Sequence, residues 1–318
     1  MTHYDVFNGD ADGICALQQL RLHTPLASTL VTGVKRDIKL MEKVQAAGGD
    51  TVTVLDIAFE KNRAAVLANL ERGAEIQYFD HHQPGEIPDH PKLHTHIDTR
   101  AEVCTSLLVN AHLQGAHVVW AVVGAFGDNL DNSAREAAQA LTLTETQLLQ
   151  LQQLGVCLNY NGYGIALEDL HFAPDALYRE VAQHPDPFSF IRSDTFKTLD
   201  AGYQSDMRNA RALQPELETQ RRAVYVLPAL PWANRVSGVF GNDLATRAPD
   251  RAHALVTQMS GGDFRISVRA PLTRKEGADQ LCSAFPTGGG RKGAAGINQL
   301  PADLYPEFLA KFADIYGE

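Results

Sequence analysis

Cysteine is scarce in this sequence of 318 residues, and its spacing excludes a common class of metal site. The four cysteines are Cys15, Cys104, Cys157 and Cys282, and none belongs to a C-x-x-C pair. We therefore expect no structural zinc site. Few cysteines in a chain of this length also indicate a reducing compartment, which predicts a cytoplasmic protein.

Long apolar runs are absent as well. No stretch approaches the roughly 20 residues that span a bilayer. The N-terminus, Met1–Tyr4, leads directly into a strand pattern, without the basic and apolar regions of a secretory signal. We therefore expect no membrane segment and no export.

Positive charge is in deficit, because 28 basic residues face 38 acidic ones, for a formal net charge of −10. This argues against an extended basic surface for duplex DNA or for an anionic membrane. A small phosphorylated substrate remains open. A metal site built from carboxylates would itself add negative charge, which bound ions would neutralise.

Several catalytic signatures are missing too. The sequence contains no G-x-S-x-G, no Walker A motif and no G-x-G-x-x-G after the first expected strand. These are the signatures of a serine nucleophile, a triphosphate-binding loop and a dinucleotide site. What remains is an ordinary globular composition, 44% hydrophobic and 21% charged, in a chain long enough for one large or two ordinary domains.

The first half of the sequence alternates short apolar runs with amphipathic segments. This alternation is typical of βαβ units and predicts a parallel sheet in an α/β domain. The expected strands are Tyr4–Phe7, Thr29–Val34, Thr51–Leu55 and Ile76–Phe79. One helix is expected to begin at Ile14. Further helices are expected over Ile38–Ala46, Glu60–Leu70 and Val103–Leu113.

Acidic residues follow three of these strands. Asp10 and Asp12 lie in the glycine-rich turn Asn8–Gly13, and Asp56 and Asp80 follow the next two buried strands. The carboxyl ends of parallel strands meet at one edge, where α/β proteins bind ligands. Two carboxylates one residue apart are costly unless a positive group lies between them. A role as helix N-cap would explain one of these two aspartates, but it explains the presence of both less well.

Two histidines, His81 and His82, follow Asp80 directly. Such a pair beside a carboxylate can bind a metal, a phosphate or both, whereas in isolation a solvated loop is the commoner explanation. The carboxylates expected at the same edge favour the metal. A further carboxylate, Asp128, follows the apolar run 118–126, which is a buried helix or a buried strand.

The pattern changes in the last third of the chain. We predict an N-terminal domain over residues 1–190, a linker with a connector helix at about 206–222 within 191–224, and a smaller α/β domain over 225–318. Strands are expected at Ala223–Leu227, Arg235–Val239, Ala252–Met259 and Phe264–Arg269, with helices over Asn242–Ala248 and Gly277–Phe285.

A glycine-rich stretch in this smaller domain is the second chemical signal. It begins Gly288, Gly289, Gly290, Arg291, Lys292 and continues to Gly296. Glycines allow a nest of N–H donors to approach an anion, and an arginine can bind a phosphate bidentately. Arg269, on the preceding strand, can face the same pocket. The alternative is a flexible loop with a solvated basic pair.

Several aspartates with one or two histidines describe a site for Mn²⁺ or Mg²⁺. Two such ions sharing a carboxylate would lie about 3.5–4 Å apart and activate a water for in-line attack on phosphorus. No protein nucleophile would be needed.

In these motifs and their order the chain resembles the DHH phosphoesterases, which are named for the sequence found here as Asp80-His81-His82. Asn8–Gly13 resembles the first family motif, Asp56 the second and Gly127-Asp128 the fourth. The glycine-rich stretch resembles the signature of the DHH-associated C-terminal domain. The resemblance covers nearly the whole chain and implies two domains with the active site in the cleft between them.

The resemblance also implies a role for each site residue. Asp56 would bridge two Mn²⁺ ions, with Mg²⁺ as the alternative ion. His82 would contact the substrate phosphate or the attacking water, and Asp80 would orient a histidine. The glycine-rich stretch would hold the far end of the substrate. The implied metal ligands are Asp10, Asp12, Asp56, His81 and Asp128.

Three positions depart from the family pattern. Many smaller members carry a histidine four residues before the first aspartate, where this chain has Val6. RecJ-like exonucleases carry an extra aspartate where this chain has Asn8, so one metal site is short of a ligand, weaker, or completed by Asn8 or water. The fourth residue of the Gly-Gly-Gly-His signature is Arg291, which keeps phosphate affinity but cannot shuttle protons.

The expected function is Mn²⁺-dependent hydrolysis of phosphodiester or terminal phosphate bonds in nucleotides or short single-stranded oligonucleotides. The chain is too short for the additional OB-fold domain of RecJ-type exonucleases, which favours small substrates over long nucleic acid. A polyphosphate or pyrophosphate hydrolase and a non-catalytic nucleotide-binding protein with a weakened metal site are the alternatives. Whether the chain forms a homodimer is left open.

Overall fold

The computed structural model describes residues 1–259 and 261–317, which form two compact units divided between Ala201 and Gly202. This division falls inside the predicted linker, 191–224. The last residue of the predicted second domain, Glu318, lies outside the described residues. Among the helices of the described chain, none combines the length and apolar character needed to cross a membrane.

The first unit contains the predicted parallel sheet. Its five strands are ordered β2-β1-β3-β4-β5, and every neighbouring pair is parallel. Phe7 pairs with Leu55 and Leu55 with Phe79, so the next residues of β1, β3 and β4 emerge side by side at the carboxyl edge. The strands are β1 (His3–Phe7), β2 (Thr29–Val31), β3 (Thr51–Leu55), β4 (Glu75–Asp80) and β5 (Leu93–Ile97).

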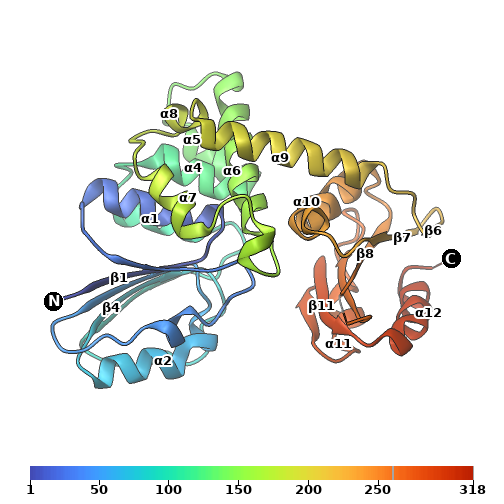
Figure 1. The fold of residues 1–318 in the computed structure, drawn as a ribbon, viewed down its shortest axis with the longest axis horizontal. Coiled ribbons are helices and arrows are strands. Elements are labelled where there is room, and N and C mark those ends of the chain that lie inside the picture. The colour runs from blue at the N-terminus through green and yellow to red at the C-terminus, as the bar shows by residue number, and fades with distance from the viewer. Residues whose placement is uncertain (260, 318) are drawn as a thin grey trace. The chain divides into compact units, whose positions relative to one another are not determined.

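Helices cover both faces of this sheet, which confirms the α/β class (Figure 1). One face carries α2 (Phe59–Glu71), packed on alternate strand residues such as Val54 and Tyr78. On the opposite face, Phe7 contacts Tyr178 with ring centroids 5.5 Å apart. The helices of that layer and its surroundings are α1 (Ala11–His23), α3 (Thr105–His112), α4 (Val118–Gly127), α5 (Asp131–Ala138), α6 (Glu145–Gly162), α7 (Pro174–Val181) and α8 (Pro187–Ile191).

The helix predicted over Ile38–Ala46 is wrong. Only a short 3₁₀ turn forms there, at Leu40–Lys43. The backbone bonds outward instead: the Met41 N–H donates to Asn62 Oδ1 of α2 at 3.1 Å. The Ala46 N–H donates to Asn69 Oδ1 of the same helix at 2.8 Å. Side chains of α2 thus satisfy backbone groups that a helix would have satisfied internally.

The predicted connector helix is also displaced. The helix α9 covers Asp194–Arg211, whereas residues 217–218 form a short strand, β6 (Leu217–Glu218), that pairs with β7.

The second unit is built on a mixed six-stranded sheet in the order β10-β11-β9-β8-β7-β6. Among the described residues of this unit, only the β7–β8 pair is parallel, and α10 (Pro231–Arg247) connects those two strands. The further strands and helices are β7 (Arg222–Leu227), β8 (Ala252–Gln258), β9 (Phe264–Arg269), α11 (Ala278–Ser283), β10 (Gly288–Arg291), β11 (Ala294–Leu300) and α12 (Tyr305–Tyr316).

One prediction in this unit is wrong, and the flexible loop given as the alternative for the glycine-rich stretch is not found. The strand expected at Arg235–Val239 lies inside α10, because buried Val236, Phe240 and Leu244 recur every fourth residue along one helix face. The glycine-rich stretch is a β-hairpin rather than a loop, since β10 pairs antiparallel with β11. Gly290 has a φ of 143°, a backbone conformation that glycine readily adopts.

Candidate metal centre

The turn after β1 places Asp10 at the N-cap of α1. Its Oδ1 accepts hydrogen bonds from the backbone N–H groups of Asp12 at 3.1 Å and of Gly13 at 3.2 Å. Its Oδ2 forms a salt bridge with Lys35. Although burial opposes it, the charge of Lys35 holds the pKa of Asp10 below its ordinary value. Both oxygens of Asp10 therefore have protein partners.

Asp12 is buried and is held by the N-terminus of α3. Its Oδ2 accepts the Thr105 N–H at 2.8 Å, and its Oδ1 accepts the Ser106 N–H at 2.6 Å. N–H groups in the first turn of a helix have no partners within the helix and stabilise a negative charge. Each Asp12 oxygen accepts one N–H and therefore retains a lone pair for a cation.

Asp56 follows β3 directly and has a φ of 59°, in the left-handed region that few residues except glycine, asparagine and aspartate enter. Its N–H donates to the Phe79 carbonyl at 3.0 Å, so the strained turn is tied to β4. Burial raises the pKa of Asp56 well above its usual range, and the charges of Asp10 and Asp12 raise it further. A cation at this position would relieve that repulsion.

His81 turns one ring nitrogen toward the carboxylates. Its Nδ1 lies 3.0 Å from the Val103 carbonyl, to which it donates, so Nε2 is free to face Asp56 Oδ1 at 3.4 Å and Asp128 Oδ2 at 3.9 Å. Burial lowers the pKa of His81, but Asp56 and then Asp12 outweigh burial and raise the pKa to about 10. The backbone carbonyl thus orients the ring as it does in many metal-binding histidines.

Asp80 orients the other histidine. It is fully buried, and its Oδ1 accepts the backbone N–H of His81 at 2.9 Å and Nδ1–H of His82 at 2.7 Å. Its Oδ2 accepts the Phe59 N–H at 3.3 Å, which ties the motif to α2. The His82 side chain is 37% exposed, so its ring is held by Asp80 while remaining accessible to a ligand.

Asp128 comes from the end of α4, which is a helix over the apolar run 118–126. A side chain on Gly127 would collide with Ala11 at the start of α1, so this glycine allows α4 to approach the first turn closely. Burial raises the pKa of Asp128, Lys35 opposes that rise, and Asp12 adds to it. The fourth predicted carboxylate therefore reaches the site from the helical layer.

These residues form two overlapping groups that fit a divalent ion. One group contains Asp56, His81 and His82, and the other contains Asp12, His81 and Asp128. Within each group the ligand atoms lie no more than 4.8 Å apart. Carboxylate oxygens with one imidazole nitrogen suit Mn²⁺ or Mg²⁺. Asp10 belongs to neither group found among the described residues.

Sequence analysis overlooked Lys35 and Asn159. Lys35 follows β2, and its Nζ donates to Asp10 and to Asn159 Oδ1, the latter at 3.0 Å. Burial lowers the pKa of Lys35, but Asp10 and then Tyr163 raise it well above its usual value. The signal was available, because β2 is parallel to β1 and delivers the residues that follow it to the same sheet edge.

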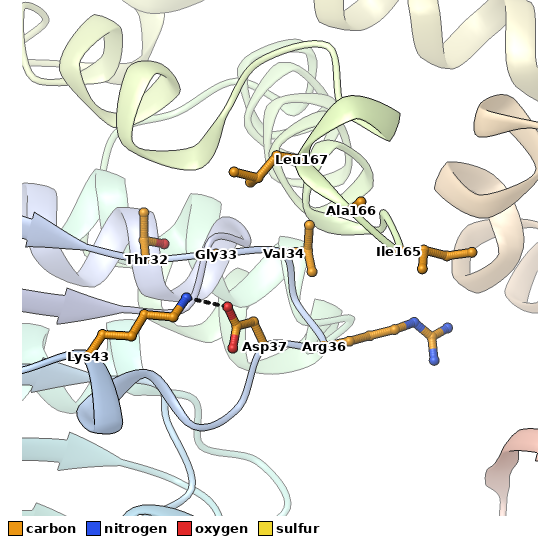
Figure 2. A pocket seen from close by; sticks show the side chains of 9 residues that line it. All are labelled: Thr32, Gly33, Val34, Arg36, Asp37, Lys43, Ile165, Ala166 and Leu167. Carbon is orange, nitrogen blue, oxygen red and sulfur yellow. Dashed lines mark hydrogen bonds and ion pairs between the residues drawn. The ribbon is translucent and has the colours of Figure 1, made fainter. Parts of the chain in front are cut away.

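A pocket of about 280 Å³ opens beside Lys35 in the first unit (Figure 2). Val34 and Arg36, the chain neighbours of Lys35, both line it. Figure 2 shows Leu167 on one side of the pocket and the Lys43–Asp37 ion pair on the other. The complete lining is Thr32, Gly33, Val34, Arg36, Asp37, Lys43, Ile165, Ala166 and Leu167.

The predicted binding residues of the second unit lie on its sheet. Arg291 is exposed at the end of β10, and Lys292 is exposed in the turn that follows. Arg269 is engaged within the unit: its Nε donates to Asn242 Oδ1 at 2.8 Å and its Nη1 to Ser267 Oγ at 3.0 Å. Arg269 thus ties β9 to α10. Gly288 and Gly289 pair with β11.

No protein-family model and no curated protein matches the sequence. Solved structures do match. RecJ from Thermus thermophilus in complex with Mn²⁺ has a TM-score of 0.66 and 18% identity, covering 98% of this chain and 51% of that one. Exonuclease RecJ bound to manganese has a TM-score of 0.61 and 17% identity, covering 98% and 88%.

A third match is the pGpG-specific phosphodiesterase PggH from Vibrio cholerae, with a TM-score of 0.58 and 13% identity, covering 99% of this chain and 100% of that one. This chain has the fold of the DHH phosphoesterases. It spans about half the length of the Thermus thermophilus RecJ chain. The carboxylates and histidines described above lie at or beside the carboxyl edge of the parallel sheet in the first unit.

Proposed function

We propose that this protein is a metal-dependent phosphoesterase that hydrolyses phosphodiester or terminal phosphate bonds of nucleotides or short single-stranded oligonucleotides. The observation that carries the proposal is the pair of metal-binding groups that share His81, one with Asp56 and His82 and the other with Asp12 and Asp128. Mn²⁺ is the ion we expect, and the two manganese-bound RecJ structures of the same fold support that choice.

The residues of the centre divide the work. Asp12, Asp56, His81 and Asp128 would hold the divalent metal, which supplies positive charge for the phosphate oxygens and lowers the pKa of water. His82 would contact the substrate phosphate. Asp80 accepts a hydrogen bond from His82 Nδ1–H, so Nε2 of the neutral ring is an acceptor for the attacking water, and it donates to a phosphate oxygen only when the ring is protonated.

The pocket beside Lys35 suits the nucleoside part of a substrate. Ile165 and Leu167 are about half exposed and offer apolar surface for a base, while Arg36 adds a cation. The lysine that lines the pocket, Lys43, is already paired with Asp37 at 2.5 Å. A polyphosphate site would need more unpaired positive charge than this pocket provides, which favours a nucleotide.

An activity screen with the purified protein and Mn²⁺ tests the proposal. The substrates are pGpG, a cyclic dinucleotide, 3′-phosphoadenosine 5′-phosphate, pyrophosphate, polyphosphate and bis-p-nitrophenyl phosphate. We expect Mn²⁺-dependent hydrolysis of at least one nucleotide. Hydrolysis restricted to pyrophosphate or polyphosphate would support the polyphosphatase alternative. A Mn²⁺-loaded protein that hydrolyses none of them would make the non-catalytic alternative correct.

The variant Asp56→Asn identifies the centre responsible for that activity. Loss of this carboxylate should lower kcat/KM by about 100-fold or more and remove bound Mn²⁺, because loss of even an outer-shell partner costs about 10–100-fold. The control is Asp131→Asn, which changes a nearby carboxylate that bonds Gln152 and belongs to neither metal-binding group. Normal turnover by Asp56→Asn would contradict the assignment of this centre.

A further inference from the structure

The resemblance to DHH phosphoesterases implies two metal ions, but the side chains around Asp10 are arranged differently. Both Asp10 oxygens are used by protein donors: Oδ1 by two backbone N–H groups and Oδ2 by the Lys35 ammonium. A metal at Oδ2 would lie beside the Lys35 ammonium, which would repel it. Asp12 also has a donor on each oxygen, but both donors are neutral backbone N–H groups, so Asp10 is the poorer ligand of the two.

Lys35 is fixed in this position by its surroundings. Its own N–H donates to the Gly162 carbonyl at the end of α6 at 2.9 Å. Its Nζ also bonds Asn159 Oδ1 at 3.0 Å and lies 5.2 Å from the centre of the Tyr163 ring. Asn159 is buried on the same helix. These contacts hold the ammonium beside Asp10 independently of the metal-binding groups.

Few protein donors remain near Asp10 for a second ion. Position 6, where many smaller DHH members carry a histidine, holds a fully buried valine that packs with Leu40 and Val54 in the core beneath α2. Asn8 Oδ1 is buried without a hydrogen-bond partner in the described part of the chain, so it is one neutral donor. Together with Asp56 it would provide two protein donors, so water would have to supply most of the ligands of a second ion beside the Lys35 charge.

We propose that the Lys35 ammonium takes the place of one of the two cations, so that this centre binds a single divalent ion through Asp12, Asp56, His81 and Asp128. Asp10 then serves to hold Lys35 rather than a metal. The inference rests on the proposed phosphoesterase function only for the use of the centre, since the ion count can be measured without any substrate. The fixed positive charge of Lys35 would face the substrate phosphate to which the metal also binds.

Metal counting on the whole, unmodified protein is the first test. The protein is equilibrated with excess Mn²⁺, freed of unbound metal by rapid gel filtration, and analysed by elemental mass spectrometry and electron paramagnetic resonance. We expect one Mn²⁺ per chain and the hyperfine spectrum of an isolated ion. Two ions of similar affinity with an exchange-coupled spectrum would overturn the proposal.

Two matched aspartate variants give a second, independent test. Asp10→Asn keeps a residue that caps helices well, and we expect its dissociation constant for Mn²⁺ to stay within about threefold of the unmodified chain. Asp12→Asn should weaken Mn²⁺ binding by more than the roughly 10–100-fold that an outer-shell loss costs. Equal losses in the two variants would show that Asp10 is a ligand and would overturn the proposal.

Lys35 itself is tested by Lys35→Met and Lys35→Arg, with folding checked by circular dichroism. Lys35→Met removes the charge and frees Asp10 Oδ2, so a second Mn²⁺ should bind at saturating metal, whereas Lys35→Arg should still bind one. A folded Lys35→Met chain that binds only one ion would overturn the role given to Lys35. The ion count and the activity of the unmodified chain separate the two proposals. Two bound ions with hydrolysis would contradict the single-ion inference and leave the proposed function intact. One bound ion without hydrolysis would contradict the proposed function and leave the single-ion inference intact.

Discussion

At the scale of single residues, backbone N–H groups decide which carboxylates need a cation. Asp12 receives two of them from α3, and Asp80 receives N–H groups from His81, His82 and Phe59. Asp56 accepts longer side-chain contacts, at 3.4 Å from Thr105 Oγ1 and from His81 Nε2, and it also lies against the Asp10 carboxylate. Asp56 is therefore the carboxylate that gains most from a bound metal.

The two histidines of the motif should differ in a measurable way. His82→Asn removes the ring held by Asp80, and we expect kcat to fall by roughly 100-fold while Mn²⁺ affinity stays within about threefold. His81→Asn, the matched variant, removes the nitrogen that faces Asp56 and should lose both turnover and metal. Steady-state kinetics with metal titrations measures both quantities. Loss of Mn²⁺ by His82→Asn would make His82 a ligand and contradict this division.

Residue chemistry was the part of the site most readily predicted from sequence. Acids after buried strands and the Asp-His-His motif indicated Asp12, Asp56 and His81, which the structure brings together. Lys35 was overlooked although the predicted strand ends directly before it, because the order of strands brings residues to one edge without showing which of them pair. No local pattern marks a lysine whose partner is 25 residues away in the sequence.

At the scale of elements, the segment between β2 and β3 depends on α2 rather than on its own propensity. Asn62 is buried and makes three hydrogen bonds with the main chain: it accepts the Met41 N–H at 3.1 Å and donates to the Ile38 and Ala58 carbonyls at 2.7 and 3.0 Å. The apolar spacing of the segment resembles a helix, but the bonds to Met41 and Ile38 are long-range and cannot be read from the spacing.

Asn62→Leu tests that dependence. It removes the three bonds and leaves buried backbone groups without partners, so we expect a loss of about 2–3 kcal/mol in the free energy of unfolding. The control is Lys61→Ala, an exposed change on the same helix that should stay within about 0.5 kcal/mol. Urea unfolding followed by circular dichroism measures the difference. Equal stability of the two variants would show that Asn62 does not anchor the segment.

The prediction of secondary structure failed where a short stretch was considered without the longer helical repeat to which it belongs. Arg235–Val239 is rich enough in β-branched residues to resemble a strand, yet the recurrence of Val236, Phe240 and Leu244 belongs to the long helix α10. Strands bounded by clear turns, such as Thr51–Leu55, were predicted to the residue. Periodicity therefore succeeds for isolated strands and fails when an element is judged on one turn.

At the scale of the whole molecule, two compact units with separate cores allow pH to act on one of them. His253 of β8 is buried in the second unit, and its Nδ1 has no hydrogen-bond partner within the described chain. Burial, followed by the charge of Arg251, lowers the pKa of His253 to about 4. The folded second unit thus favours the neutral ring.

Stability should therefore fall on acidification through this histidine. Because the folded pKa lies below the unfolded value of about 6.5, protons bind the unfolded chain more tightly. The contribution of the neutral His253 ring to the free energy of unfolding is fully present above about pH 6.5 and should decrease by about 2 kcal/mol between about pH 7 and pH 5. His253→Gln should show a weaker pH dependence of the second unit's unfolding in calorimetry without metal. An identical pH dependence in both chains would contradict this role.

The second unit also offers Arg291, which the DHH resemblance assigns to the far end of the substrate. Arg291→Ala should raise the KM for a dinucleotide by roughly 10-fold or more with little change in kcat, because a charge-assisted hydrogen bond contributes about 1.5–3 kcal/mol. The KM for bis-p-nitrophenyl phosphate should not change, since that small substrate has no far end to hold. Arg221→Ala, which removes another exposed arginine of the same unit, serves as the control. If Arg291→Ala left the dinucleotide KM unchanged, or raised both KM values equally, Arg291 would not read the length of the substrate.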